Sequence, residues 1–171
     1  MDKIADQLEK DFNESELENV SEDIETLRQI LDNLVKISFS QEEVMKSTQK
    51  VNARSASVSD LMTRQFRVKN NMKIIEDSLN ALARRQTSVR PFIQTEVSKI
   101  QDYLLSSQTD LQDRKVSQAS KNQQFVLTSM NNLKKLGYFL SFHLGLYLRY
   151  LFNYMQNSGK LFKYFSCSNI R

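Results

Sequence analysis

Apolar residues recur at alternating spacings of three and four along most of the chain, which places them on one face of an α-helix. The first seam of this kind predicts a helix over residues 16–37. The pattern is interrupted at Ser38 and resumes over 41–52, where we expect a second, shorter helix. The seam of the first helix consists of Leu17, Val20, Ile24, Leu27, Leu31 and Leu34.

Pairs of Ser and Glu residues set the predicted starts of these two helices. In a capping box, a Ser and a Glu three residues later each accept a hydrogen bond from the other's backbone N–H. Ser40 and Glu43 have this spacing, and so do Ser15 and Glu18. We therefore expect one helix to end near Ile37 and the next to start after Ser40.

Two longer seams follow a small, polar run at 52–57, which is the clearest loop in the chain. They predict helices over 58–85 and 89–111, and Pro91 is tolerated in the first turn of the second. Because the connection is short, these helices are expected to form an antiparallel hairpin. The seams are Val58, Leu61, Gln65, Val68, Met72, Ile75, Leu79 and Leu82, widened by Met62 and Phe66, and then Ile93, Val97, Ile100, Leu104, Ser107 and Leu111.

A last seam begins after residues 113–115 and predicts a further helix, with Val116, Ala119, Gln123, Val126, Met130 and Leu133 in register. Gln65, Ser107 and Gln123 are polar residues on three different seams. They either bind one another across a core, where such interruptions fix the register of helices, or are partly exposed.

These patterns predict an all-α fold, an elongated antiparallel helical bundle that resembles a coiled coil, with four to five helices over residues 15–135. Residues 1–14 are acidic and are expected to form a flexible N-terminus. The chain of 171 residues has three Gly, one Pro and no alternating β-branched runs, so a sheet is not expected.

Composition changes sharply near Leu136. Residues 1–137 contain 20 basic and 20 acidic side chains, whereas 138–171 contains four basic residues and no acid. The segment 136–171 is therefore an apolar, aromatic and basic tail, in which nearly every helix face would be apolar.

Three explanations of this tail compete. Residues 136–155 have about the length of a membrane span, although Arg149, His143 and Asn153 make insertion marginal. The stretch could instead continue the last helix and pack on the bundle. It could also be an out-of-frame reading of an AT-rich gene, a hypothesis that fits the loss of acidic residues. Since exposed apolar stretches promote aggregation, we expect residues 1–135 alone to be the more soluble form.

Candidate chemistry is sparse, and the sequence predicts no catalytic, cofactor-binding or metal-binding residue. His143 has no acidic or Cys residue nearby in the sequence, and Cys167 lacks the context of a nucleophile. Arg84 and Arg85 lie at a predicted helix end and, with Arg90, form at most a small anion-binding patch. The carboxylate pairs Glu22–Asp23 and Glu42–Glu43 are expected in first helical turns, where their negative charge interacts favourably with the helix dipole.

Several blocks together resemble an uncharacterised family of large Bacteroidetes proteins, which have transmembrane helices near the N-terminus and a long helical region behind them. The resemblance covers about residues 21–133 and implies a fragment of a membrane-anchored cell-envelope protein, with no known activity. No signal peptide is recognisable in the first twenty residues. The blocks are LRQILDNLVKISFSQEEVMK at 27–46, IIEDSLNALARRQ at 74–86, PFIQTEVSKIQ at 91–101 and QQFVLTSMNNL at 123–133.

The expected function is that of a non-enzymatic structural or protein-interaction module, because long amphipathic seams without a polar constellation are suited to binding other helices. Other helical protein segments or a second copy of the chain are the expected partners. The neutral main body argues against nucleic acid, and no small-molecule substrate or cofactor is implied. The alternative is a membrane-associated protein that acts through its apolar C-terminal segment.

Overall fold

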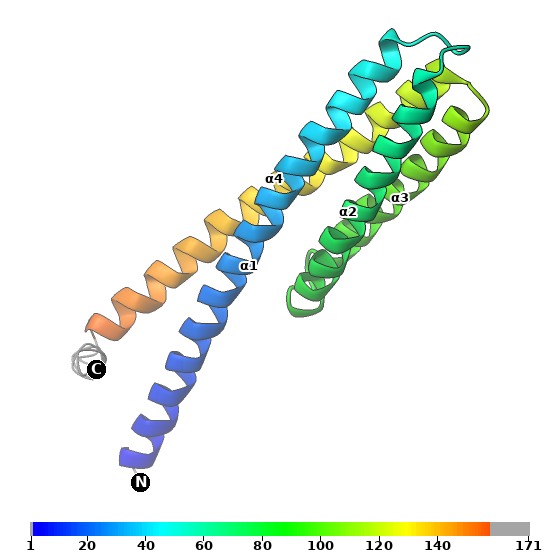
Figure 1. The fold of residues 1–171 in the computed structure, drawn as a ribbon. Coiled ribbons are helices and arrows are strands. Elements are labelled where there is room, and N and C mark those ends of the chain that lie inside the picture. The colour runs from blue at the N-terminus through cyan, green and yellow to red at the C-terminus, as the bar shows by residue number, and fades with distance from the viewer. Residues whose placement is uncertain (1, 158–171) are drawn as a thin grey trace, which may run out of the picture. The chain divides into compact units, whose positions relative to one another are not determined.

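The computed structural model describes residues 2–157, with the side chains of Asp11 and of residues 15–154. This part of the chain forms four helices and no strand: α1 (Asp2–Lys50), α2 (Ser57–Arg85), α3 (Arg90–Gln112) and α4 (Val116–Asn157) (Figure 1). The predicted all-α helical bundle is confirmed. The N-terminus that we expected to be flexible is helical from Asp2 onward.

The helices are distributed over two compact units, and α1 and α4 each contribute to both. One unit comprises residues 28–138 and is called the four-helix unit below, because it contains α2, α3 and parts of α1 and α4. The other, called the two-helix unit, comprises residues 1–27 and 139–171.

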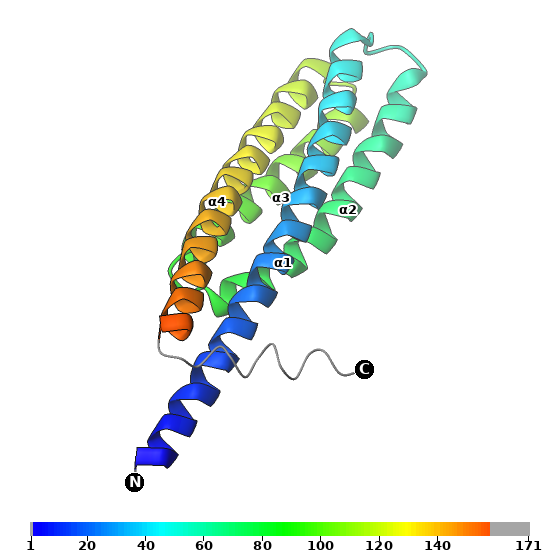
Figure 2. The ribbon, with the colours of Figure 1, turned by 90° about the vertical axis from the view of Figure 1, so that its left-hand side faces the viewer.

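In the four-helix unit, α2 and α3 form the predicted antiparallel hairpin, joined by a short turn after Arg85 (Figure 2). Every seam residue predicted for these two helices is buried. Of the two residues expected to widen the stripe of α2, Met62 is half-buried and Phe66 is exposed. Pro91 lies in the first turn of α3, as expected from its missing N–H.

The predicted break at Ser40 is wrong, because α1 is one continuous helix from Asp2 to Lys50. The Ser38 hydroxyl donates to the Leu34 carbonyl oxygen at 2.6 Å, and the Ser40 hydroxyl donates to the Lys36 carbonyl oxygen at 3.3 Å. Each hydroxyl therefore donates to the carbonyl four residues earlier in the same helix. Serine makes this bond in a helix interior, where it does not act as a cap.

The buried face of α1 also continues where the apolar pattern was interrupted. Ser38 is itself buried, and Gln41, Val44 and Thr48 extend the same face toward the end of the helix. The capping box expected at Ser15 is also absent, because Ser15 lies in the interior of α1 and not at the start of a helix.

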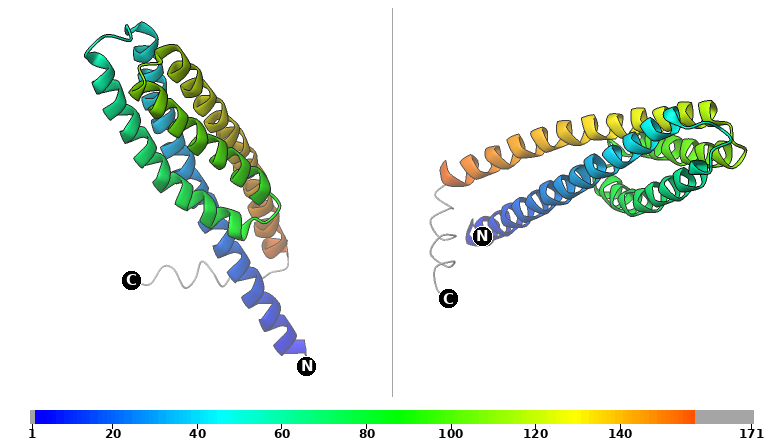
Figure 3. Two further views of the ribbon diagram at one scale, coloured as in Figure 1. Left: turned by 90° about the vertical axis from the view of Figure 1, so that its right-hand side faces the viewer. Right: turned by 45° about the horizontal axis from the view of Figure 1, so that its top comes forward.

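Arg114 connects the two loops at one end of the four-helix unit, where the α1–α2 and α3–α4 connections lie together (Figure 3). Its φ of 58° is left-handed, and the Lys115 N–H bonds the Asp110 carbonyl while the Arg114 N–H bonds the Leu111 carbonyl. These two bonds form a Schellman motif, in which Gly is the usual left-handed residue. The Arg114 guanidinium donates to the Ala53 carbonyl at 2.8 Å, a contact that Gly could not make.

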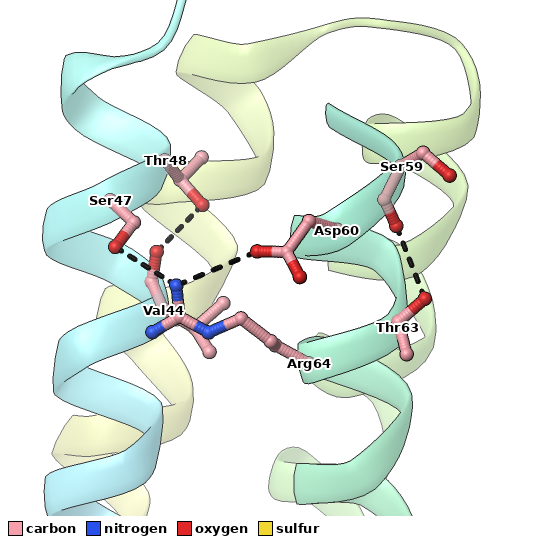
Figure 4. Close-up of polar contacts among 7 residues, drawn as sticks. All are labelled: Val44, Ser47, Thr48, Ser59, Asp60, Thr63 and Arg64. Atoms are coloured by element: carbon pink, nitrogen blue, oxygen red, sulfur yellow. Dashed lines mark hydrogen bonds and ion pairs between the residues drawn. The ribbon is translucent and has the colours of Figure 1, made fainter. Parts of the chain in front are cut away.

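Polar contacts also join α1 and α2 near this end of the four-helix unit (Figure 4). The Arg64 guanidinium donates to the Ser47 hydroxyl at 3.2 Å across the two helices, and it lies 3.9 Å from the Asp60 carboxylate on its own helix. The Thr48 hydroxyl is turned inward and donates to the Val44 carbonyl at 2.8 Å.

A glycine allows α1 and α4 to approach closely within the four-helix unit. Gly137 is buried, and a Cβ atom added there would lie 2.6 Å from Leu31 Cδ2. The side chain of Leu31 fills the space that any larger residue at 137 would need.

The apolar stretch that begins at Leu136 continues the last helix, since α4 extends to Asn157. In the part of the chain that the structure describes, no helix has the length and apolar character that crossing a membrane requires. The remainder of the expected tail, 158–171, lies outside the described residues.

Candidate functional site

Three glutamine side chains from three helices meet in the core of the four-helix unit. Gln41 of α1, Gln65 of α2 and Gln123 of α4 are all fully buried. Gln65 Nε2 donates to Gln41 Oε1 at 2.8 Å, and Gln41 Nε2 donates back to Gln65 Oε1 at 3.3 Å. Gln123 Nε2 also donates to Gln65 Oε1, at 2.9 Å. Gln65 is thus the centre of the cluster.

The hypothesis that polar seam residues bind one another is correct for Gln65 and Gln123. Ser107 is also fully buried, but its hydroxyl donates to the Leu104 carbonyl of its own helix at 2.9 Å. Gln123 Oε1 is buried and accepts no hydrogen bond from the described residues. Amides of this kind offer no acid, base or nucleophile, so the cluster acts by fixing the relative register of α1, α2 and α4.

Gln41 was missed by sequence reasoning because it follows Ser40 and was assigned to the first turn of a separate helix. The signal that could have identified it is its distance from the seam residue Leu34, which is seven positions earlier. Seven residues are two helical turns, so Gln41 lies on the same face if the helix is continuous.

The α3–α4 contact contains a second group of buried polar residues. Glu96 is buried and accepts from Lys99 Nζ at 2.7 Å and from Asn132 Nδ2 at 3.2 Å. Burial alone raises the pKa of the Glu96 carboxyl, but the hydrogen bonds from Lys99, Asn132 and Ser129 outweigh it, so the pKa lies below its ordinary value. Glu96 is therefore ionised at neutral pH and joins the two helices.

The outer side of the α2–α3 hairpin has a groove of about 560 Å³. Phe66 of α2 and Leu105 of α3 line it and remain 54% and 57% exposed. Its rim is crossed by a hydrogen bond from Gln101 Nε2 to Glu76 Oε2 at 2.6 Å. The lining combines apolar side chains with charged ones, as grooves that accept an amphipathic helix do.

A smaller groove of about 280 Å³ lies between α1 and α4 of the same unit. Phe39 is exposed and lines this groove. Lys134 lies in the groove, where burial lowers its pKa and the charge of Glu42 opposes that shift. Glu42 pairs with Lys46 at 2.7 Å.

The two-helix unit has a row of exposed apolar residues on α4. We call Phe139, Phe142, Leu146 and Tyr150 the aromatic stripe, because their spacings of three, four and four place them on one helix face. The His143 ring contacts two of them: it is tilted by 60° to the Phe139 ring, with the centroids 4.1 Å apart, and lies edge-on to the Phe142 ring, with the centroids 5.8 Å apart.

The residues weighed for chemistry in the sequence lie on several elements of the structure. Arg84 and Arg85 are in the last turn of α2, as predicted, and Arg90 begins α3. The carboxylate pairs expected in first helical turns, Glu22–Asp23 and Glu42–Glu43, lie in the interior of α1, because that helix is unbroken. Cys167 is outside the described residues, and within the described residues no three His, Cys, Asp or Glu side chains gather as metal ligands would.

The chain matches no family model, no curated protein and no solved structure. Function is therefore inferred from the surfaces described above.

Proposed function

We propose that this chain is a non-enzymatic structural or protein-interaction module whose four-helix unit binds a helical segment of another protein in the α2–α3 groove. The observation that carries this proposal is the exposure of Phe66 and Leu105 within that groove. The seams of α2 and α3 are buried in the core, whereas Phe66 and Leu105 lie outside these seams and keep more than half of their surface exposed. Exposed large apolar groups that share a groove favour a protein contact.

The charges at the rim suggest what the partner helix looks like. Along α2, Lys69 and Lys73 line one part of the groove, and Glu76 and Asp77 line the next turn. Asp102 of α3 adds to the acidic part. A matching partner is an amphipathic helix whose apolar stripe faces Phe66, with acidic residues toward Lys73 and basic residues toward Asp77.

Photo-crosslinking in the organism that encodes the chain tests this proposal. A photoreactive phenylalanine analogue replaces Phe66 or Leu105 in separate variants of the full chain, and the exposed residue Ala81 of α2 is the control position. We expect both groove positions, but not position 81, to link to the same protein. Mapping of the linked peptide should show a helix with the stated charge pattern.

A charge reversal, Lys73→Glu, should reduce that crosslink at least fivefold, because it repels the acidic part of the partner. Equal crosslinking at positions 66 and 81, or a linked peptide with no apolar stripe, would overturn the proposal. A location in the cell envelope stays a prediction that depends only on the resemblance of residues 21–133.

The second candidate function is association with a membrane through the C-terminal part of α4. The specific observation in its favour is the exposure of the aromatic stripe, since aromatic side chains are favoured at the interface of lipid and water. Sedimentation of the full chain with lipid vesicles, lost in Phe142→Glu, tests this alternative.

A further inference from the structure

Lys134 of α4 lies in the groove of about 280 Å³ between α1 and α4 of the four-helix unit. Leu127, which is two helical turns earlier on α4, lines the same groove. From α1 the groove is lined by the apolar side chains of Val35, Phe39 and Met45. Lys134 is half-buried, so part of its side chain is withdrawn from water among apolar groups.

This setting changes the acid–base chemistry of the amine. Loss of water around Lys134 Nζ disfavours the charged ammonium form and lowers its pKa. The negative charge of Glu42, which lines the groove from α1, opposes this shift but does not cancel it. Glu42 is itself paired with Lys46 at 2.7 Å, which weakens its attraction for the Lys134 ammonium. A larger fraction of this amine is therefore neutral than in a fully hydrated lysine, and the neutral amine is the nucleophilic form.

The surroundings of the groove indicate which kind of electrophile reaches Lys134. The four-helix unit, residues 28–138, carries 18 basic and ten acidic side chains, a net charge of +8, so it attracts anions. The apolar lining of the groove accommodates a short hydrocarbon chain. Phe39 lines the groove and is 63% exposed, so a reagent can enter from solvent. An anionic donor of a short acyl group combines these properties.

We propose that Lys134 is an acylation site, at which the amine accepts a short acyl group from an anionic activated donor, either an acyl phosphate or the thioester of an anionic carrier. The neutral Nζ attacks the acyl carbon and forms a C–N bond. The bond from that carbon to the leaving group breaks with its electron pair, which releases phosphate or thiolate, and the nitrogen loses one proton to solvent. The product is a neutral amide, so acylation removes one positive charge from the four-helix unit.

Acetylation of the full chain by acetyl phosphate tests this proposal, with the exposed neighbour Lys135 as the matched control. Mass spectrometry of peptides, cut by a protease that does not recognise lysine, gives the rate at each position. Near neutral pH we expect Lys134 to react about threefold faster than Lys135 or more, because a larger fraction of its amine is neutral. In concentrated urea the two rates should become equal, because the groove is then lost. A second arm uses acetyl coenzyme A, and the donor that gives the preference is the class that the site uses.

Two substitutions on α1 should change the ratio of these rates in opposite directions. Phe39→Ala removes an apolar wall and admits water to the groove, so the ratio should fall about twofold or more. Glu42→Gln removes the charge that favours the ammonium form, so the ratio should rise by a similar factor. Phe66→Ala, at an exposed phenylalanine of the α2–α3 groove, should leave the ratio unchanged. Circular dichroism should show unchanged helix content in all three variants, which separates an effect on the groove from loss of folding.

Three results would overturn the acylation site: equal rates at the two lysines of the folded chain with both donors, a preference for Lys134 that persists in urea, or a preference that neither Phe39→Ala nor Glu42→Gln changes. The first would show that the groove does not activate the amine, and the other two would attribute the preference to local sequence. None of these results bears on crosslinking at Phe66, so failure of this site and failure of the α2–α3 groove proposal are distinguishable.

Discussion

Replacing each glutamine of the buried cluster by leucine should give three different losses of stability. Leucine has a similar size but no polar atoms, so the cost depends on how many buried partners are left without a hydrogen bond. Without Gln65, three atoms lose their partner: Gln41 Oε1, Gln41 Nε2 and Gln123 Nε2. Each unpaired buried atom costs about 1–3 kcal/mol, so Gln65→Leu should lower the free energy of unfolding by about 3 kcal/mol or more.

The other two substitutions leave fewer partners behind. Gln41→Leu leaves only Gln65 Nε2 unpaired, because Gln65 Oε1 still accepts from Gln123. The expected loss is about 1 kcal/mol. Gln123→Leu leaves no donor or acceptor of the other two residues unpaired, and it removes an oxygen that accepts no hydrogen bond from the described residues. Its expected effect is about zero or slightly stabilising.

Urea unfolding followed by circular dichroism measures these differences, with the exposed neighbour Gln124→Leu as the control, expected within about 0.5 kcal/mol of the parent. Replacing all three buried glutamines together should recover most of the stability lost in Gln65→Leu, since no amide is then left unpaired. Equal losses for the three single variants, or the largest loss for Gln123→Leu, would refute the hydrogen-bonding arrangement described here.

Four further substitutions have expected outcomes in the same unfolding assay. Leu79→Ala should cost about 2–5 kcal/mol, because Leu79 is buried in the hairpin seam, and an unchanged midpoint would contradict that burial. Gly137→Ala should cost up to about 2 kcal/mol through its close contact, whereas Gly145→Ala, with open space around it, should gain about 0.5–1 kcal/mol; the same sign for both would disprove the close approach. Ser40→Ala should be neutral or gain up to about 0.5 kcal/mol, since Ser40 is inside a helix, and a loss above 1 kcal/mol would restore the predicted cap. Glu96→Gln should cost about 1 kcal/mol at neutral pH. Because the pKa of Glu96 is lowered in the folded state, this contribution is present above the pKa of an unfolded Glu and is lost as the pH falls through the lower folded value, so an identical pH profile in both proteins would show that the carboxylate does not contribute.

The sequence alone determined the seams of α2 and α3, from Val58 to Leu111. In these helices the apolar residues fit only one helix face. Pro91 marks the start of α3, because its missing N–H is not needed in a first helical turn. Local information was sufficient there, because the periodicity, the loop residues and the later packing all agree.

The course of α1 was decided by tertiary structure. Ser40 and Glu43 have the local spacing of a cap, and nothing in their neighbourhood reveals that Gln65 on another helix will bind Gln41. Burial of that pair requires the helix to continue in register past Ser40, and this long-range gain outweighs the local capping preference.

The charge distribution likewise became informative only with the fold. Residues 1–137 are neutral as a whole, but the boundary between the units at Leu27 separates a segment of net charge −8 from a four-helix unit with 18 basic and ten acidic side chains. A sum along the chain cannot show this, because opposite charges cancel in the total although they belong to different units. The sequence determined where helices form; which faces are covered, and which side chains remain for a partner, depended on how those helices pack.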